Sequence, residues 1–185
     1  MKLKIPYHSQ FDEITMLDWK EKGCSVTCLK MCLDFAKSDA IPSIDSLIKE
    51  GIVIGGYLDG IGWRHDALVR LAHNYGVPAY AEEFKSVKVD VASKTFSQNI
   101  FENDLLDIGV RRIRGAIERN VPVIVSISRQ NGSHQIVVVG FEDNLGATTG
   151  FYINDPDNRL GERKEIFVPI SEFLTEWRKF AVFVG

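Results

Sequence analysis

All three cysteines of this 185-residue chain fall in one stretch that the sequence predicts to be a helix. They occupy positions 24, 28 and 32, and steps of four residues place them on one helical stripe. Cys24 comes at the expected start of the helix, where the partial positive charge of a helix N-terminus favours a thiolate over a thiol. Cys28 and Cys32 lie deeper, and we expect them to pack as small apolar side chains. Cys24 is therefore a candidate nucleophile if the fold brings a base to it.

His134 is the candidate base among the four histidines. It opens a β-rich run immediately after the polar segment 129–133. His65 and His73 fall on one predicted helix, so we expect packing or surface roles for both, and His8 lies in a loop with no evident partner. Because the candidate nucleophile is far away in the sequence, only the fold can bring it to His134.

Asp155 is the candidate partner of His134, because the two residues lie on consecutive predicted strands. Antiparallel pairing sets the start of one strand against the end of the next, so we pair His134 with Asp155. In that register Ile136 faces Ile153, which gives one buried face, and Asn154 points away. A carboxylate beside an imidazole fixes its tautomer and supports the imidazolium, as in a catalytic triad. The alternative is a capping aspartate before a proline turn, with an incidental histidine beside it.

Helices dominate the first part of the chain and strands the second, which predicts an α+β fold with a helical half packed on an antiparallel sheet. The whole of residues 1–185 is expected to form one domain. Helices are expected at 24–35, 43–51, 64–75, 105–120 and 171–177, and strands at 79–84, 123–127, 135–141, 151–153, 165–168 and 180–184. Segments 11–22 and 51–63 read as loops, and 85–104 as an exposed excursion of no assigned structure.

The composition is that of an ordinary globular protein and excludes several classes of function. A formal net charge of −3 gives no basic footprint for nucleic acid. No apolar run approaches the roughly 20 residues that cross a bilayer, and the N-terminus lacks the apolar core of a signal peptide. Three cysteines on one helix make no disulfide framework, so a cytoplasmic location is the simplest expectation. The oligomeric state stays open.

Several segments together resemble one enzyme family over nearly the whole chain. They are Ile5-Pro6-Tyr7-His8-Ser9-Gln10, Gly23-Cys24 with the helix that follows, Asn120 to Val125, Ser133 to Phe141, Asn154-Asp155-Pro156, and the final segment from Phe173 to Trp177. In these the chain is similar to the papain-like cysteine peptidases that process bacterial bacteriocin leader peptides at double-glycine sites, and to their relatives in peptidase family thirty-nine. The order Gln, Cys, His, Asp is that of the family, and the spacing from His134 to Asp155-Pro156 is its most specific part.

The resemblance implies a role for each matching residue. Cys24 matches the nucleophile, His134 the general base and Asp155 the residue that orients the base. Gln10 matches the glutamine whose side-chain amide helps to stabilise the oxyanion. Two features depart from the family: Ser25 stands where glycine usually follows the nucleophile, and Gln10 lies farther before Cys24 than in the leader-processing enzymes.

The prediction is therefore a papain-like thiol hydrolase, and specifically a cysteine peptidase that acts on a peptide or protein substrate. It needs no cofactor and no metal, since cysteines at four-residue steps on one helix do not match a tetrahedral zinc site. Two alternatives remain open on the same fold. One is a catalytically inactive peptide-binding module, and the other is an acyl transferase that uses the same triad.

Overall fold

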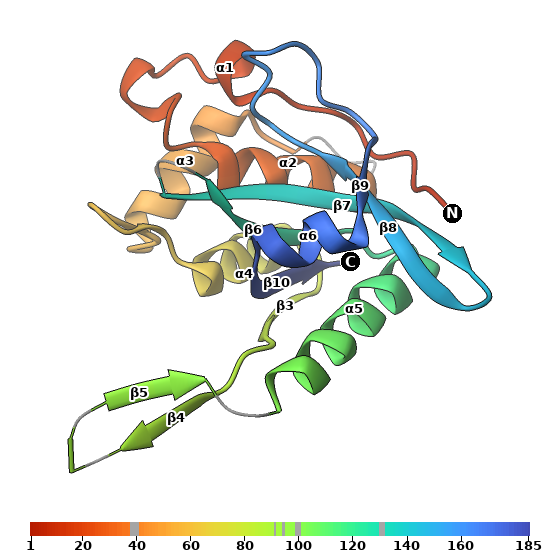
Figure 1. The fold of residues 1–185 in the computed structure, drawn as a ribbon. Helices are drawn as coiled ribbons and strands as arrows, with labels where there is room; N and C mark the ends of the chain where they lie inside the picture. Colours follow the sequence, from red (N-terminus) through yellow and green to blue (C-terminus); the bar gives the residue numbers. More distant parts are fainter. Residues whose placement is uncertain (38–40, 91, 94, 99–100, 130–131) are drawn as a thin grey trace.

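The computed structural model describes residues 1–37, 41–90, 92–93, 95–98, 101–129 and 132–185 (Figure 1). Within this part of the chain a six-stranded antiparallel sheet forms the centre, in the order β3-β10-β6-β7-β8-β9. The strands are β3 (Ala79–Glu83), β6 (Val123–Arg129), β7 (Gly132–Asn144), β8 (Ala147–Asn154), β9 (Ile166–Pro169) and β10 (Trp177–Val184). The middle strands β10, β6 and β7 carry nearly continuous apolar runs because both of their faces are covered.

Helices cover the sheet on both sides (Figure 1). The long helices α2 (Cys24–Ala36) and α5 (Glu102–Glu118) lie on opposite sides of it in the picture. The other helices are α1 (Gln10–Glu13), α3 (Ile44–Val53), α4 (His65–Asn74) and α6 (Ile170–Glu176), with a short 3-10 turn, η1 (Leu17–Trp19). Most of α2 is buried, as its apolar circumference predicts. The α+β prediction is confirmed, although β3 from the first half of the chain joins one edge of the sheet.

Two predicted loops, and the segment 85–104 to which the sequence assigned no structure, hold regular structure. Segment 11–22 contains most of α1 and all of η1, and segment 51–63 contains the hairpin of β1 (Tyr57–Leu58) and β2 (Gly62–Trp63). Segment 85–104 forms the hairpin of β4 (Val87–Asp90) and β5 (Thr95–Gln98), which projects from the body, and then begins α5 (Figure 1). Residues 91, 94, 99 and 100 of that segment, and residues 130 and 131 before His134, lie outside the described part of the chain.

The predicted end of the second helix at Gly51 is wrong. Helix α3 continues to Val53, and Ser43 caps its start by accepting a hydrogen bond from the Ser46 N–H. A Cβ atom on Gly51 would lie 2.4 Å from the ring of Trp63. The glycine therefore allows close packing of the β1–β2 hairpin on α3 and does not terminate the helix.

The predicted register between β7 and β8 is wrong by two residues. Val138, and not Ile136, pairs with Ile153. The strands turn tightly at Leu145–Gly146, and the register shifts between Val138 and Gly140 and again farther along. A slip of two residues preserves the alternation of side chains, so the predicted faces survive. Among the described residues no helix is long and apolar enough to cross a membrane.

Candidate active site

Cys24 is the first residue of α2, and Gly23 before it is the N-cap. A Cβ atom on Gly23 would come 2.1 Å from Ile14 Cδ1 and 3.0 Å from the carbonyl oxygen of Trp19. Only glycine fits between α2 and the preceding segment, which fixes the point where the helix begins. The Cys24 side chain is half-buried, and its sulfur lies 3.9 Å from the Ser25 hydroxyl oxygen.

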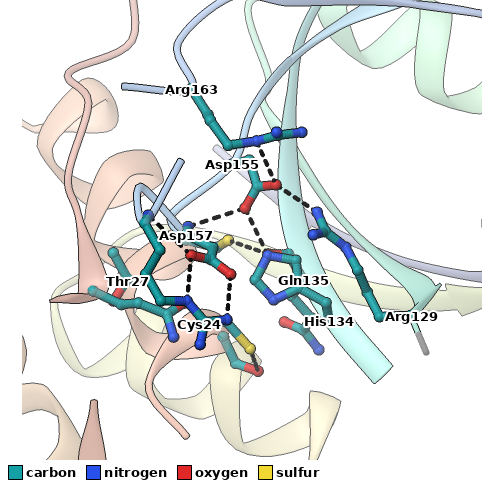
Figure 2. Close-up of polar contacts among 12 residues, drawn as sticks. Cys24, Thr27, Arg129, His134, Gln135, Asp155, Asp157 and Arg163 are labelled. Atoms are coloured by element: carbon teal, nitrogen blue, oxygen red, sulfur yellow. Dashed lines mark hydrogen bonds and ion pairs between the residues drawn. The ribbon is translucent and has the colours of Figure 1, made fainter. Parts of the chain in front are cut away.

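His134 and Asp155 are in direct contact (Figure 2). The Nε2 atom of His134 lies 2.6 Å from Oδ1 of Asp155, and the Asp155 side chain is fully buried. Asn154 takes no part, because its Oδ1 accepts a hydrogen bond of 2.8 Å from the Glu165 N–H. The predicted contact is therefore present although the strand register differs. With Nε2 engaged, Nδ1 is the imidazole nitrogen that remains for the Cys24 thiol.

Asp155 has further partners that the sequence did not predict. Arg129 Nη2 donates to its Oδ2 at 2.6 Å, and Arg163 Nε donates to the same oxygen at 3.1 Å (Figure 2). The Asp157 N–H donates to Oδ1 at 3.0 Å, and the Tyr7 hydroxyl donates to the backbone carbonyl at 2.9 Å. The sequence offered a hint of Arg129 as a partner, since this residue at the end of β6 begins the polar segment before His134. Nothing in the sequence pattern marks Arg163.

Charge interactions hold Asp155 and His134 in their ionised forms. Burial opposes ionisation of Asp155, but the hydrogen bond and the charge of His134 outweigh it, with help from the Asp157 N–H and Arg129, and lower the pKa of Asp155 to about 2. Burial likewise opposes the imidazolium, but hydrogen bonds and charge interactions with Asp155 and Cys24 raise the pKa of His134 to about 9.

The Cys24 thiol has a pKa below its ordinary value. Burial alone would raise that pKa, yet the hydrogen bond and the charge of His134 prevail, and the Gln135 backbone and the Ser25 hydroxyl add to the effect. The helix N-terminus acts in the same direction. The arrangement favours a thiolate beside an imidazolium near neutral pH, which is the reactive form of a nucleophilic cysteine.

Cys28 and Cys32 behave as the sequence predicts for core residues. Both are fully buried, and burial raises the pKa of each thiol above its ordinary value. The Cys28 thiol donates to the Gln135 carbonyl at 3.3 Å and so ties α2 to β7, one residue beyond His134. All three cysteines are free thiols. No cluster of His, Cys, Asp and Glu side chains suited to a metal ion occurs among the described residues.

Gln10 is buried at the start of α1. Its backbone N–H donates to the Pro156 carbonyl at 3.0 Å, which ties the N-terminal segment to the turn after Asp155. Its side-chain Nε2 donates to the Lys20 carbonyl at 2.7 Å, and its Oε1 has no hydrogen-bond partner among the described residues. One amide proton of Gln10 remains available, since an amide carries two. The oxyanion role of Gln10 therefore stays a prediction.

Two cavities flank the Cys24–His134 pair. The first, of about 520 Å³, is lined by Cys24, and the second, of about 630 Å³, is lined by His134 and Gln10. His65 also lines the first cavity, where its Nε2 lies 3.0 Å from the Ser126 hydroxyl. The expected packing role of His65 is confirmed by its stacking on Phe180, but the expectation did not include its place in the cavity beside Cys24. Its position on a helix gave no signal, because only the tertiary fold sets α4 against β6.

The remaining two histidines lie away from these cavities. His8 bridges two carboxylates, with Nδ1 2.8 Å from Glu13 and Nε2 2.8 Å from Asp34. The loop position of His8 gave no indication of these partners. His73 Nε2 lies 3.0 Å from the Ala79 carbonyl, which fits the expected surface role.

Comparison with known proteins adds to this geometry. A sequence profile of the Peptidase_C39 like family matches residues 2–182. The chain belongs to this family. No curated protein matches it. Solved structures with the same cysteine peptidase fold include a double glycine motif protease from an AMS/PCAT transporter in complex with the leader peptide. The two chains are 16% identical with a TM-score of 0.58, and the match covers 100% of this chain and 94% of that one. The peptidase domain of Streptococcus ComA, a bi-functional ABC transporter, is similar at 16% identity and a TM-score of 0.55, covering 89% and 92%.

Proposed function

We propose that this chain is a thiol hydrolase, and specifically a cysteine peptidase, in which residues 1–185 act as one domain. The observation that carries the proposal is the hydrogen bond of His134 to the buried Asp155, with Cys24 close enough to His134 for the imidazole to lower the pKa of the thiol. Membership of the Peptidase_C39 like family supports it. The leader peptide bound to the similar protease supports a peptide as the class of substrate.

In the first step the Cys24 thiolate attacks the carbonyl carbon of the scissile bond, and the carbonyl π electrons move to oxygen. The carbon–nitrogen bond then breaks as the tetrahedral intermediate collapses. The His134 imidazolium gives its Nδ1 proton to the departing amine, and a thioester with Cys24 remains. Asp155 holds the ring by its Nε2–H throughout and stays ionised.

In the second step neutral His134 removes a proton from a water molecule, and the resulting hydroxide attacks the thioester carbon. The carbon–sulfur bond breaks, the carboxylic acid product leaves, and the thiolate–imidazolium pair is restored. Asp155 again stabilises the charged imidazole. The same two side chains therefore serve both halves of the reaction.

The negative charge on the carbonyl oxygen needs donors. The Cys24 N–H is the first of its helix, and such groups lack an intrahelical acceptor. The Gln10 amide is the second donor that we propose, through the proton that Lys20 does not take. Preorganised donors of this kind act where the charge develops in the transition state.

The test is digestion of a defined peptide library by the full chain, with products identified by mass spectrometry. New termini should accumulate with the wild-type protein and with Cys32→Ala, which removes a buried thiol outside the site. They should be absent with Cys24→Ala. Products that persist in the Cys24→Ala sample, or no products from any library with folded wild-type protein, would contradict the proposal.

One observation favours the alternative of a peptide-binding module. The Gln10 amide already donates to the Lys20 carbonyl, so only one of its protons is left for an oxyanion. A module of this kind would hold library peptides in the cavities and release them intact. Equilibrium capture of peptides by wild-type protein, together with the absence of new termini, would favour that function.

A further inference from the structure

The cavity beside Cys24 carries an excess of positive charge that no carboxylate of the described residues neutralises. Glu21, Lys22, Arg64, Lys85 and Arg178 are the charged side chains that line it. Arg64 is paired with Asp66 at 2.8 Å, Lys85 with Glu83 at 2.9 Å, and Glu21 with Arg159 at 3.1 Å. Lys22 and Arg178 remain.

The two remaining cations are placed for a ligand. The Lys22 ammonium lies over the rings of Trp19 and Tyr57, 5.8 and 5.7 Å from their centroids, and makes no ion pair within the described chain. The Arg178 side chain makes neither a hydrogen bond nor an ion pair within the described chain, and it is near enough to His65 to act on that ring electrostatically. Both side chains lie on the exposed rim, where an arriving anion meets them first.

The inner wall of the cavity supplies a second, independent feature. Gln135 is buried, and its Nε2 donates to the Ser126 hydroxyl at 3.4 Å. Its Oε1 has no hydrogen-bond partner among the described residues, although buried acceptors are normally paired. His65 shares Ser126 from the other side and stacks on Phe180 with ring centroids 3.8 Å apart. The wall beside the two cations is therefore polar and held by a hydrogen-bond network, with Gln135 Oε1 itself buried beneath the cavity surface.

We propose that this cavity binds an acidic side chain of the peptide substrate close to the scissile bond, with Arg178 and Lys22 receiving the carboxylate. Arg178 is the main specificity-determining residue, because a guanidinium offers several donors to a carboxylate. The proposal rests on the peptidase function, but its charge selectivity can be measured without turnover.

The first measurement compares alkylation of Cys24 by iodoacetate and by iodoacetamide, each rate being divided by that of free glutathione. The iodoacetate-to-iodoacetamide ratio should fall about fivefold in Arg178→Gln and fall with added salt. Arg112→Gln, an exposed arginine on α5, is the matched control and should keep the wild-type ratio. His134 attracts iodoacetate equally in all variants, so an unchanged ratio in Arg178→Gln overturns the proposal.

The second measurement uses the peptide library. Cleaved peptides should be enriched in Asp or Glu next to the cut bond, and Arg178→Gln should remove the enrichment while Arg112→Gln keeps it. Replacing that Glu by Gln in one good substrate should lower kcat/KM about fivefold in wild type and leave the Arg178→Gln value unchanged. The absence of such an enrichment overturns the proposal. An enrichment that disappears when the peptides carry a C-terminal amide also overturns it, because the cavity would then bind the terminal carboxylate and not the side chain. If no peptide is cut, the peptidase function fails, and the iodoacetate ratio still decides the cavity.

Discussion

Two groups beside the Cys24–His134 pair, the Asp155 carboxylate and the Gln135 amide, differ in how completely their hydrogen bonds are satisfied. On one side, both carboxylate oxygens of Asp155 accept two hydrogen bonds each, and Arg129 and Arg163 neutralise its charge (Figure 2). On the other side, in the cavity next to Cys24, the buried Oε1 of Gln135 has no partner among the described residues.

This difference separates what the fold provides from what a ligand must provide. A group that orients a catalytic base works best when it is already held in place before the substrate arrives. A recognition surface gains affinity and selectivity when its own groups are paired only by the ligand, because a wrong ligand leaves them unpaired. The Asp155 carboxylate is held in place in advance, as an orienting group should be. The cavity beside Cys24 leaves groups for a ligand to pair, as a recognition surface should.

The largest expected effect comes from Asp155→Asn, which breaks the satisfied side. The amide leaves Arg129 and Arg163 without their carboxylate and can hold the His134 ring in the wrong tautomer. We expect kcat/KM to fall by about 10⁴-fold, as for the equivalent change in a serine triad. The pKa of His134 should fall from about 9, which NMR titration of the imidazole measures without a substrate.

Asp157→Asn is the control for that variant, because the Asp157 backbone N–H still donates to Asp155 while its carboxylate pairs with Arg159. It should keep the pKa of His134 and most of the activity. Equal losses of kcat/KM in the two variants would show that the charge of Asp155 has no special part in the reaction.

The three cysteines of α2 provide the next comparison. Cys24 should react with iodoacetamide at pH 7 about 1,000-fold faster than Cys28 or Cys32, because the other two thiols are buried and their pKa values are raised. Peptide mapping by mass spectrometry after short exposures measures each site. Labelling of Cys28 in the folded protein at the rate of Cys24 would contradict the assignment of the nucleophile.

Gln10→Ala extends the comparison to the second cavity, which Gln10 lines together with His134. Loss of one oxyanion donor should lower kcat by about 100- to 1,000-fold, while the Cys24 alkylation rate stays the same because the thiolate depends on His134. If Gln10 only satisfies backbone groups, the variant should instead lose about 1–3 kcal/mol of stability and keep its rate per folded molecule. Turnover normalised to folded protein, with a thermal melt alongside, decides between these outcomes.

The smallest effect is expected at the edge of the satisfied side, in Arg129→Met. His134 must be protonated to give a proton to the leaving amine, so kcat/KM should fall as pH rises through about 9. Removing the Arg129 charge lets Asp155 act more strongly on the imidazolium, which raises the pKa of His134. The alkaline limb should therefore move upward, by up to about half a pH unit.

Arg114→Met is the control, since its partners Glu118 and Asp143 lie away from the Asp155 network. This account of Arg129 would be contradicted if the alkaline limb of the pH profile moved downward in Arg129→Met, or moved by an equal amount in Arg114→Met.

The sequence determined the features that follow from local periodicity. Apolar residues around the whole circumference of α2 predicted a buried helix, and Gly23 marked its start at Cys24. The alternation of residues in β7 and β8 placed His134 and Asp155 on a common face. That result withstood a register error of two residues, because a side chain in a strand returns to the same face at every second position.

Only the tertiary structure decided which groups meet at the ends of these elements. Arg163 reaches Asp155 from a segment without any periodic pattern, and His65 reaches the cavity because α4 packs beside β6 and β10. Gln10 is held by hydrogen bonds to the carbonyls of Lys20 and Pro156, and no periodic pattern in the sequence links it to either residue. Periodicity specifies which face a residue occupies, whereas bulges, turns and loop paths set the distances between residues far apart in sequence, and hydrogen bonds depend on those distances.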